Sequence, residues 1–402
     1  MSRGMKDLVR SALVAEAELV VVKVGTRVLA PGPDGRIDRS MIDNLARQIH
    51  GMRALGKSVV LVSSGAVGAG LHRLGLDHRP TDVAKLQAVA AVGQAHLLQL
   101  YEQSLLRFGL HAAQVLLTAG DLEDRTRYLN VRNTLRTLLE YGAVPIINEN
   151  DTVAVDELVA TFGDNDRLAA LVTNLLRAPL MIILSHVDGL LERLADGTVR
   201  VVPIVRRFTP QVWGLVQPET SPLGRGGMTS KLEAARIVAA AGENAIIAGG
   251  RTPRVLERLM AGEPLGTLIL TQRKSIPSRK RWIGFSVSPA GTITVDEGAA
   301  DAVTRQGGSL LAVGITRVEG SFRKGDVVRI TRQDGREIAR GLTNYAAGEL
   351  AKIRGLRSDR FLQVLGHCPY DEVVHRDNLV LDPRPAAAPS DESPGRPGRG
   401  SI

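Results

Sequence analysis

The chain has 402 residues, of which 44% are hydrophobic, 23% charged and 3% aromatic, and its formal net charge is +9. This length favours two domains, and the apolar content is typical of a soluble globular protein. So few aromatic residues argue against an RNA-binding surface built mainly from stacked rings, and a basic balance equally suits an enzyme that acts on anionic substrates.

The only cysteine in the sequence is Cys368, which excludes an internal disulfide and suits a reducing cytoplasm. We interpret it as a structural thiol. Glu16 and Glu18 interrupt the first apolar run, which therefore does not read as a signal peptide or a membrane span. We expect a cytoplasmic protein without a membrane segment.

Short apolar runs rich in β-branched residues alternate with amphipathic helical patterns over the first 270 residues. Strands are predicted at 19–24, 58–62, 111–117, 143–147, 180–184, 244–248 and 266–270. Helices are predicted between them at 41–55, 83–108, 130–140, 166–176 and 231–241. This alternation predicts an open, mainly parallel α/β sheet covered by helices on both faces, with ligands at the carboxyl ends of its strands.

The pattern changes in a basic stretch around Pro277, residues 271–282, which we interpret as an exposed linker. Short glycine-rich strands follow, with a hairpin signal at Asp334-Gly335, and they predict a small β-rich domain. The last residues are rich in Pro, Gly and Ser and are expected to be disordered. The predicted parts are an N-terminal extension 1–18, a first domain 19–271, a linker 272–280, a second domain 281–381 and a tail 382–402.

Three predicted strands end in small or polar residues that suit a ligand. "VVKVG" puts Lys23 at a strand end just before Gly25, where the backbone can approach a phosphate closely. "VSSGA" places Ser64 in a strand-to-helix turn whose N–H groups suit a carboxylate or phosphate, and "INEND" offers Asp151 as partner for an ammonium group. The structural alternatives are a strand-end lysine that reaches solvent, a tight turn, and an Asx turn.

Two further stretches open predicted helices. "FGDNDRLAAL" sets Asp164, Asn165 and Asp166 in a row, although a helix cap needs only one such residue. "LGRGGMTSKLEAA" has a glycine-rich loop before Lys231, and a cation at a helix start is unfavourable unless an anion is bound. A flexible loop with a surface lysine is the alternative. The chain has no Walker motif, so any nucleotide site is not a P-loop.

Taken in order, these stretches resemble the glutamate 5-kinases of the amino-acid kinase family, from about residue 19 to residue 378. "VGQAHLLQLYEQ" and "LLTAGDLEDRTRYLNVRNTL" add to the likeness, and "RKRWI", "GTITVDEGAADAV" and "VHRDNLV" resemble a PUA domain. The resemblance implies the amino-acid kinase fold and transfer of the γ-phosphoryl group of ATP, with Mg²⁺, to the side-chain carboxylate of L-glutamate. That reaction gives L-glutamyl 5-phosphate in the first step of proline biosynthesis. Inhibition by proline, a homo-oligomer (dimer or tetramer) and glutamyl-phosphate reductase as a partner are also implied.

The same resemblance assigns roles to individual residues. Lys23, Lys231 and Asp166 would be catalytic, as two phosphate-binding lysines held by a carboxylate. The substrate would be bound by Ser64, Asp151 and Asn165, with Asp164 in support. The ATP-binding residues would be Lys23, Gly25, Ser185, His186, Arg225, Gly226, Gly227, Met228, Thr229, Ser230 and Lys231. No protein metal ligand is implied, because Mg²⁺ would be carried by ATP.

Two residues depart from the family pattern on the nucleotide side. His186 stands where members usually carry Asp, and Arg225 stands where they usually carry Thr. Three alternatives stay open from the sequence: a related kinase with another carboxylate acceptor, a catalytically inactive regulator, and an RNA-binding protein that uses the basic linker and the PUA-like domain.

Overall fold

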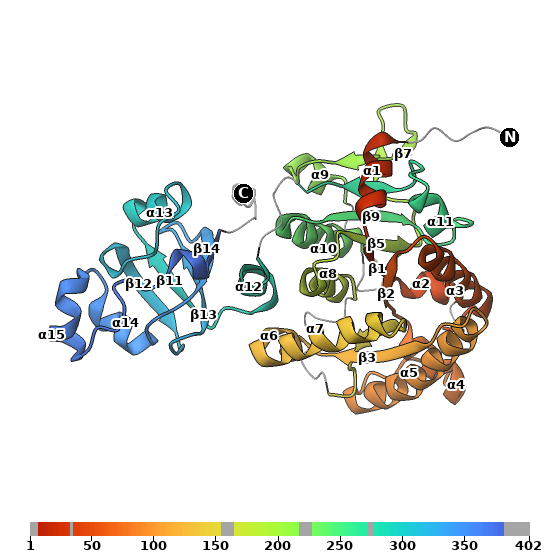
Figure 1. Ribbon diagram of the computed structural model, residues 1–402, viewed down its shortest axis with the longest axis horizontal. Coiled ribbons are helices and arrows are strands. Elements are labelled where there is room, and N and C mark those ends of the chain that lie inside the picture. The colour runs from red at the N-terminus through yellow and green to blue at the C-terminus, as the bar shows by residue number, and fades with distance from the viewer. Residues whose placement is uncertain (1–6, 33–34, 154–164, 217–226, 272–276, 382–402) are drawn as a thin grey trace, which may run out of the picture.

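The computed structural model describes residues 7–32, 35–153, 165–216, 227–271 and 277–381 (Figure 1). The larger sheet contains β1 (Leu19–Val24), β2 (Ser58–Val62), β3 (Ala112–Leu117), β4 (Val144–Glu149), β5 (Leu180–Ser185), β8 (Ile204–Val205), β9 (Asn244–Gly249) and β10 (Thr267–Ile269). Its strand order is β3-β4-β2-β1-β5-β9-β10-β8. A hairpin of β6 (Leu191–Arg193) and β7 (Val199–Val201) forms a separate small ribbon.

Neighbouring strands from β3 to β9 are all parallel, and only β10 runs against β9. The carboxyl ends of β4, β2, β1 and β5 therefore open side by side at one edge of the sheet. Side chains alternate between the faces of a strand. In β1, Val20 and Val22 belong to one core cluster and Val21 to the other, so Lys23 points to the same face as Val21.

Helices cover both faces of this sheet. One face carries α1 (Leu8–Glu16), α2 (Thr26–Leu29), α3 (Arg39–Ala54), α4 (Ala66–Leu74), α5 (Val83–Leu106) and α11 (Val255–Met260). The other carries α6 (Ala119–Glu123), α7 (Arg125–Glu140), α8 (Asn165–Leu176), α9 (Pro210–Gly214) and α10 (Met228–Ala241). The predicted fold class is thus confirmed. The prediction for α7 began five residues late, because Asp124 caps the helix there by accepting from the N–H of Arg127.

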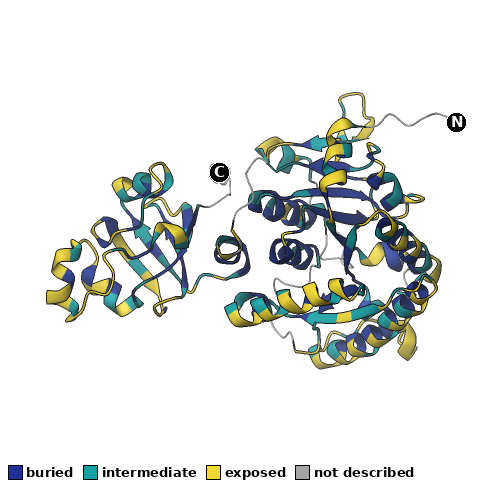
Figure 2. Cartoon of the chain, viewed as in Figure 1, coloured by how far each residue is buried: buried dark blue, intermediate teal, exposed yellow. Residues whose placement is uncertain are grey.

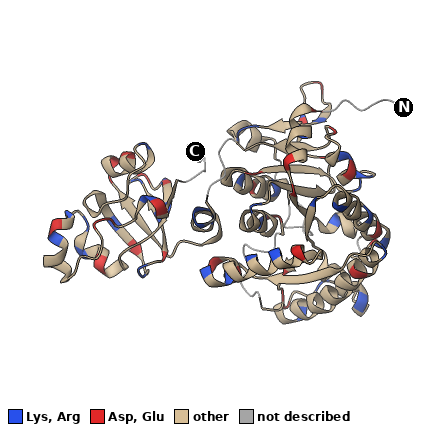
Figure 3. Cartoon of the chain, in the orientation of Figure 1, with Lys and Arg blue, Asp and Glu red and all other residues tan. Residues whose placement is uncertain are grey.

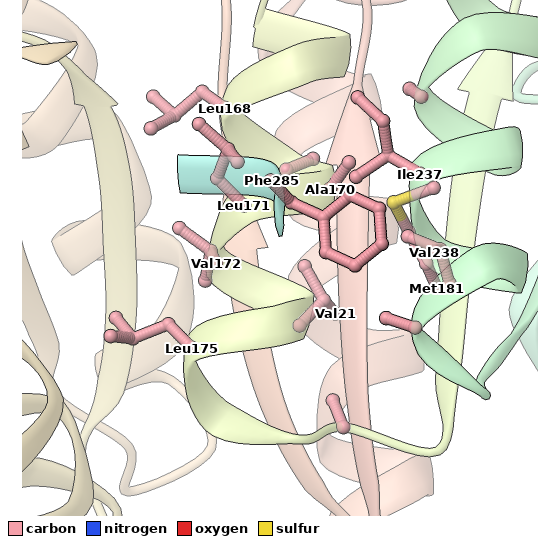
Figure 4. Close-up of a cluster of buried hydrophobic side chains, with 14 of the residues drawn as sticks. Val21, Leu168, Ala170, Leu171, Val172, Leu175, Met181, Ile237, Val238 and Phe285 are labelled. Atoms are coloured by element: carbon pink, nitrogen blue, oxygen red, sulfur yellow. The ribbon is translucent and has the colours of Figure 1, made fainter. Parts of the chain in front are cut away.

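A short segment after the sheet packs into its core. It consists of α12 (Ser278–Arg281) and the π-helical turn η1 (Trp282–Ser286), and both contact α8. Figure 4 shows the Phe285 ring among side chains of α8 and α10, such as Leu171 and Val238. Helix α8 is therefore enclosed by the sheet, by α10 and by this segment, and Figure 2 shows it almost entirely in the colour of buried residues.

The prediction of an exposed linker is wrong for its last two residues, Arg281 and Trp282, which are buried. Arg281 has 0% of its surface exposed and forms an ion pair with Glu243, just beyond α10. The next residue, Trp282, donates its indole N–H to the carbonyl oxygen of Glu123 over 3.1 Å. These partners precede Arg281 by at least 38 residues, which explains why the local basic pattern reads as exposed. Residues 272–276 of the same stretch lie outside the described residues.

The second sheet contains β11 (Gly291–Val295), β12 (Ile315–Gly320), β13 (Val327–Thr331), β14 (Glu337–Leu342) and β15 (Leu379–Leu381), in the order β12-β11-β13-β14-β15. The helical pieces around it are α13 (Glu297–Thr304), η2 (Ala312–Gly314), α14 (Ala347–Ile353), η3 (Ser358–Arg360), α15 (Phe361–Leu365) and η4 (Arg376–Asn378). The hairpin predicted at Asp334-Gly335 is confirmed, since β13 and β14 pair antiparallel across it.

Two further sequence predictions concern Cys368 and the carboxyl-terminal tail. Cys368, interpreted as a structural thiol, is exposed, and the predicted tail 382–402 lies outside the described residues. Within the part of the chain that the structure describes, no helix combines the length and apolar character needed to cross a membrane.

Candidate active site

Three charged side chains meet where β1, α8 and α10 converge, and we call Lys23, Asp166 and Lys231 the ion triad. Lys23 Nζ lies 2.7 Å from Asp166 Oδ1, and Lys231 Nζ lies 3.1 Å from Asp166 Oδ2. The face of β1 that carries Lys23 is the one covered by α8 and α10, and both partners lie in the first turns of those helices. The triad is therefore a direct product of strand alternation and helix placement.

The ion triad is buried: 4% of Lys23, 0% of Asp166 and 5% of Lys231 is exposed. Burial alone raises the pKa of Asp166, but the charges of Lys23 and Lys231 outweigh it and hold that pKa below its usual range. Ser230 Oγ also donates to Asp166 Oδ2 over 3.0 Å. Two cations around one carboxylate leave a formal charge of +1, which favours binding of an anion beside the triad.

The amino end of α10 adds to this positive field. Its N-cap residue, Gly227, makes no side-chain cap, and Met228 and Thr229 open the first turn before Ser230 and Lys231. The first N–H groups of a helix have no partner within the helix, and the helix dipole favours negative charge there. Arg225 and Gly226, and likewise Asp164 before α8, lie outside the described residues.

An amide cluster of Gln94, Asn148 and Asn165 adjoins the triad. Asn165 Nδ2 donates to Ser63 O (2.7 Å), to Asn148 Oδ1 (2.9 Å) and to Ser64 Oγ (3.1 Å). Asn148 Nδ2 in turn donates to Gln94 Oε1 over 3.1 Å. The cluster thus fixes the side chain that directly precedes Asp166, and it joins the ends of β2 and β4 to the start of α8.

Gln94 also reaches Asp151, since its Nε2 lies 3.3 Å from Asp151 Oδ2. The predicted substrate residues Ser64, Asp151 and Asn165 are therefore brought together, with Gln94 as the link. Sequence reasoning missed Gln94. A signal for it existed, because Gln94 is the polar member of a helical stripe whose other members, Ala90, Leu97 and Tyr101, are buried core residues.

Glycines allow the helix that carries Gln94 to approach the site. A Cβ atom on Gly93 would lie 1.7 Å from the Ala66 carbonyl oxygen, and one on Gly70 would lie 1.9 Å from that of Val89. Helices α4 and α5 can therefore cross with their backbones in contact. Gly65, the N-cap of α4, has a φ of 99°, a left-handed conformation that favours glycine.

The remaining predicted residues lie on the other side of β1. The Gly25 N–H donates to Leu184 O over 3.2 Å, and Arg27 Nη1 lies 3.3 Å from His186 Nε2. Ser185 is 1% exposed, and its hydroxyl has no hydrogen-bond partner among the described residues. Since the strand order is β4-β2-β1-β5, the amide cluster lies on one side of β1 and Ser185 and His186 lie on the other, while Gly25 directly follows β1 and bonds to β5.

The described residues offer no cluster of three or more His, Cys, Asp and Glu side chains that fits a metal ion. The one carboxylate at the centre, Asp166, is already held by two lysines. A divalent cation carried into the site by a ligand is compatible with this arrangement, whereas a metal held by the described side chains alone is not.

Comparison with known proteins identifies relatives over most of the chain. Residues 18–249 match the model of the amino acid kinase family, and residues 291–365 match the PUA domain. A protein named glutamate 5-kinase from Rhodopirellula baltica is 46% identical over 374 residues, 93% of this chain and 96% of that protein. Proteins of the same name from Geobacter sulfurreducens and Pseudomonas paraeruginosa are 44% and 47% identical, cover 92% of this chain, and are themselves covered to 100% and 99%. The chain therefore belongs to the amino acid kinase family and carries a PUA domain after the kinase region.

Proposed function

We propose that the protein transfers the γ-phosphoryl group of ATP to the side-chain carboxylate of L-glutamate, which gives L-glutamyl 5-phosphate. The observation that carries this proposal is the ion triad, a buried site with a formal excess of one positive charge, set between two groups of polar side chains. The near full-length similarity to proteins named glutamate 5-kinase supports glutamate as the acceptor. The reaction would begin proline biosynthesis.

In this proposal Lys23 and Lys231 contact the phosphoryl group in transit, and Asp166 is the residue that holds both ammonium groups in place. The carboxylate oxygen of glutamate attacks the γ-phosphorus, the bond from that phosphorus to the β–γ bridging oxygen breaks, and ADP leaves. No proton moves, because a free glutamate side chain with a pKa of about 4.3 is already ionised at neutral pH. Positioning and positive charge then account for most of the catalysis.

Glutamate would lie on the side of the amide cluster. Ser64 and Asn165 offer polar contacts for a carboxylate, and Asp151 offers one for the α-ammonium group. Gln94 would be a positioning residue, since it bonds to both Asn148 and Asp151. Asp164, which is not among the described residues, is proposed to support the same pocket.

ATP would lie on the opposite side of the triad, over the ends of β1 and β5. Gly25 lies directly beside the Lys23 ammonium group, since a Cβ atom on Gly25 would be in van der Waals contact with Lys23 Nζ at 3.8 Å. Ser185 and His186 would contact the nucleotide from the end of β5. The loop before α10 and its first turn would supply the other contacts: Arg225, Gly226, Gly227, Met228, Thr229 and Ser230. Mg²⁺ bound to ATP would neutralise phosphate charge.

Further features of the proposal rest on the resemblance to glutamate 5-kinases rather than on the site. We propose feedback inhibition by proline, a dimeric or tetrameric assembly, a cytoplasmic location, and a glutamyl-phosphate reductase as a partner. RNA binding is not retained as a second function, because Arg281, one of the basic residues that motivated it, is buried against Glu243.

The proposal is tested with an acceptor panel. Purified protein is incubated with ATP, Mg²⁺ and hydroxylamine, and with one acceptor at a time: L-glutamate, L-aspartate, N-acetyl-L-glutamate or carbamate. Hydroxylamine traps the acyl phosphate as a hydroxamate. ADP release is measured in parallel for every acceptor. We expect hydroxamate and matching ADP release with L-glutamate and little with the others. Preference for another acceptor would overturn the choice of glutamate but keep a kinase, whereas no product from any acceptor would overturn the proposed activity itself.

A further inference from the structure

A second concentration of positive charge lies away from the ion triad, in a cleft between α3, α4 and α5. Its volume is about 310 Å³, and three arginines and two histidines line it: Arg36, Arg39, Arg73, His72 and His96. Among the described residues, no Asp or Glu lines it; Asp34, two residues before Arg36, lies outside them. We call these five side chains and the space between them the basic cleft.

Four of the five side chains of the basic cleft are not neutralised by acids among the described residues. Among the described residues, no carboxylate lies within 4 Å of a charged nitrogen of Arg39, Arg73, His72 or His96; Arg39 instead donates to the neutral Gln103 over 3.2 Å. On the same face of the sheet, Arg47 by contrast pairs with Glu257, and Arg107 pairs with Asp43. Figure 3 shows a blue segment on α4 at the lower right of the view, with no red segment on that helix.

The surroundings of the basic cleft shift the pKa of one of its own side chains, His96. The pKa of His96 lies below its usual value, first because the ring is partly buried and then because Arg73 and His72 repel its protonated form. Only the smaller part of this shift, the repulsion by Arg73 and His72, comes from charge in the cleft, and an anion bound between these side chains would reduce it.

The floor of the basic cleft is apolar and is held by backbone contacts. Ile37, Ala69 and Leu100 line it and are each at most 8% exposed. The loop that carries Ile37 lies directly on α4, because Gly35, with a φ of 66°, approaches Gly68 so closely that a Cβ atom would lie 2.8 Å from its Cα. An apolar floor with a few charged groups at the rim is the usual construction of a small-molecule pocket, and 310 Å³ lies at the small end of that class.

The basic cleft is distinct from the candidate active site. Arg73 lies eight residues beyond Gly65 along α4, which at 1.5 Å per residue is about 12 Å from the turn that holds Ser64. The Ile37 side chain nevertheless spans part of that distance, since its Cδ1 would lie 3.5 Å from a Cβ atom on Gly65.

We propose that the basic cleft binds a small organic or inorganic anion that carries at least two negative charges, either a phosphate compound or a polycarboxylate. The two arginine charges of Arg39 and Arg73 favour a multivalent anion over a monovalent one, and the apolar floor suits a compact ligand over an extended polymer. This inference does not depend on the proposed kinase activity.

The test is calorimetric titration of the full-length protein with pyrophosphate and, separately, with citrate, at constant ionic strength set with sodium chloride. The double variant Arg39→Gln/Arg73→Gln removes two charges from the cleft. The matched control Arg193→Gln/Arg207→Gln removes two exposed arginine charges elsewhere. Any binding of pyrophosphate at the ion triad is common to all three proteins and therefore cancels.

We expect the wild type and the control to show a binding component that is weakened at least about tenfold in the cleft variant, as loss of charge-assisted contacts implies. The anion that gives this component, pyrophosphate or citrate, identifies the phosphate or the carboxylate class. Because Arg39 and Arg73 are both exposed, the variant should unfold at the wild-type temperature; if it does not, each single variant is titrated instead. Absence of binding in the wild type, or equal binding in the cleft variant, would overturn the proposal.

Discussion

Replacing Asp166 by asparagine removes the only negative charge of the ion triad and leaves Lys23 and Lys231 buried side by side. Breaking a buried ion pair typically costs 3–5 kcal/mol, roughly, because a charge is left without compensation. We therefore expect the free energy of unfolding of the kinase region to fall by about 3–5 kcal/mol.

Activity should also fall, because lysines that Asp166 no longer holds in place stabilise the transferring phosphoryl group less well. Loss of one such contact lowers kcat by about 10²–10³. Urea unfolding at pH 7.5 and hydroxamate formation measure the two effects. Ser230→Ala serves as the control for the stability measurement alone, because Ser230 is also a proposed ATP contact; it removes a neutral hydroxyl 3.0 Å from the same Asp166 oxygen and should cost about 1 kcal/mol. The reasoning would be refuted if Asp166→Asn had a free energy of unfolding within about 1 kcal/mol of the wild type and a kcat within about threefold of it.

Three further predictions concern the same region. The pKa of Asp166 is lowered in the folded protein, so the stability that its charge contributes is complete above the unfolded pKa of about 3.9 and is lost as the pH falls through the folded pKa. When the free energy of unfolding is measured against pH, the wild type should therefore show a loss at acid pH that Asp166→Asn does not show. Asn165→Ala should raise the KM for glutamate by about tenfold and leave the KM for ATP within about twofold, which steady-state kinetics in each substrate would check. Gly93→Ala should destabilise the protein by more than about 2 kcal/mol, because its Cβ atom would lie 1.7 Å from Ala66 O. Gly51→Ala is the matched helical control: its Cβ atom would meet no atom within 4 Å, so it should stabilise the protein by about 0.5–1 kcal/mol. Thermal unfolding compares the two variants.

Most of the first sheet follows from local patterns in the sequence. The predicted limits of β1 and β2 are the observed ones, because both are short runs rich in valine, set between Glu18 and Gly25 and between Lys57 and Ser63. The alternation within β1 also explains Lys23. Read locally, that lysine equally fits a strand-end residue that reaches solvent, and its burial depends on Asp166, which is 143 residues further along the chain and arrives only when α8 packs on the sheet.

The features that the sequence did not reveal depend on distant partners. Gln94 reads as one polar residue in a long helix until its bonds to Asn148 and Asp151 are known. Arg281 reads as part of an exposed basic run until Glu243 is placed beside it. In each case the local pattern gives the residue type and the tertiary contact gives its role, so the polar residues were harder to assign than the apolar ones.

The central claim, that the ion triad transfers a phosphoryl group from ATP to glutamate, is tested most directly by glutamate-dependent ADP release in the wild type beside Lys231→Ala. The account predicts turnover in the wild type that depends on both substrates and is about 10²–10³-fold lower in the variant, with the variant still folded by circular dichroism. Equal turnover in the two proteins, or none in folded wild type supplied with ATP, Mg²⁺ and glutamate, would contradict it.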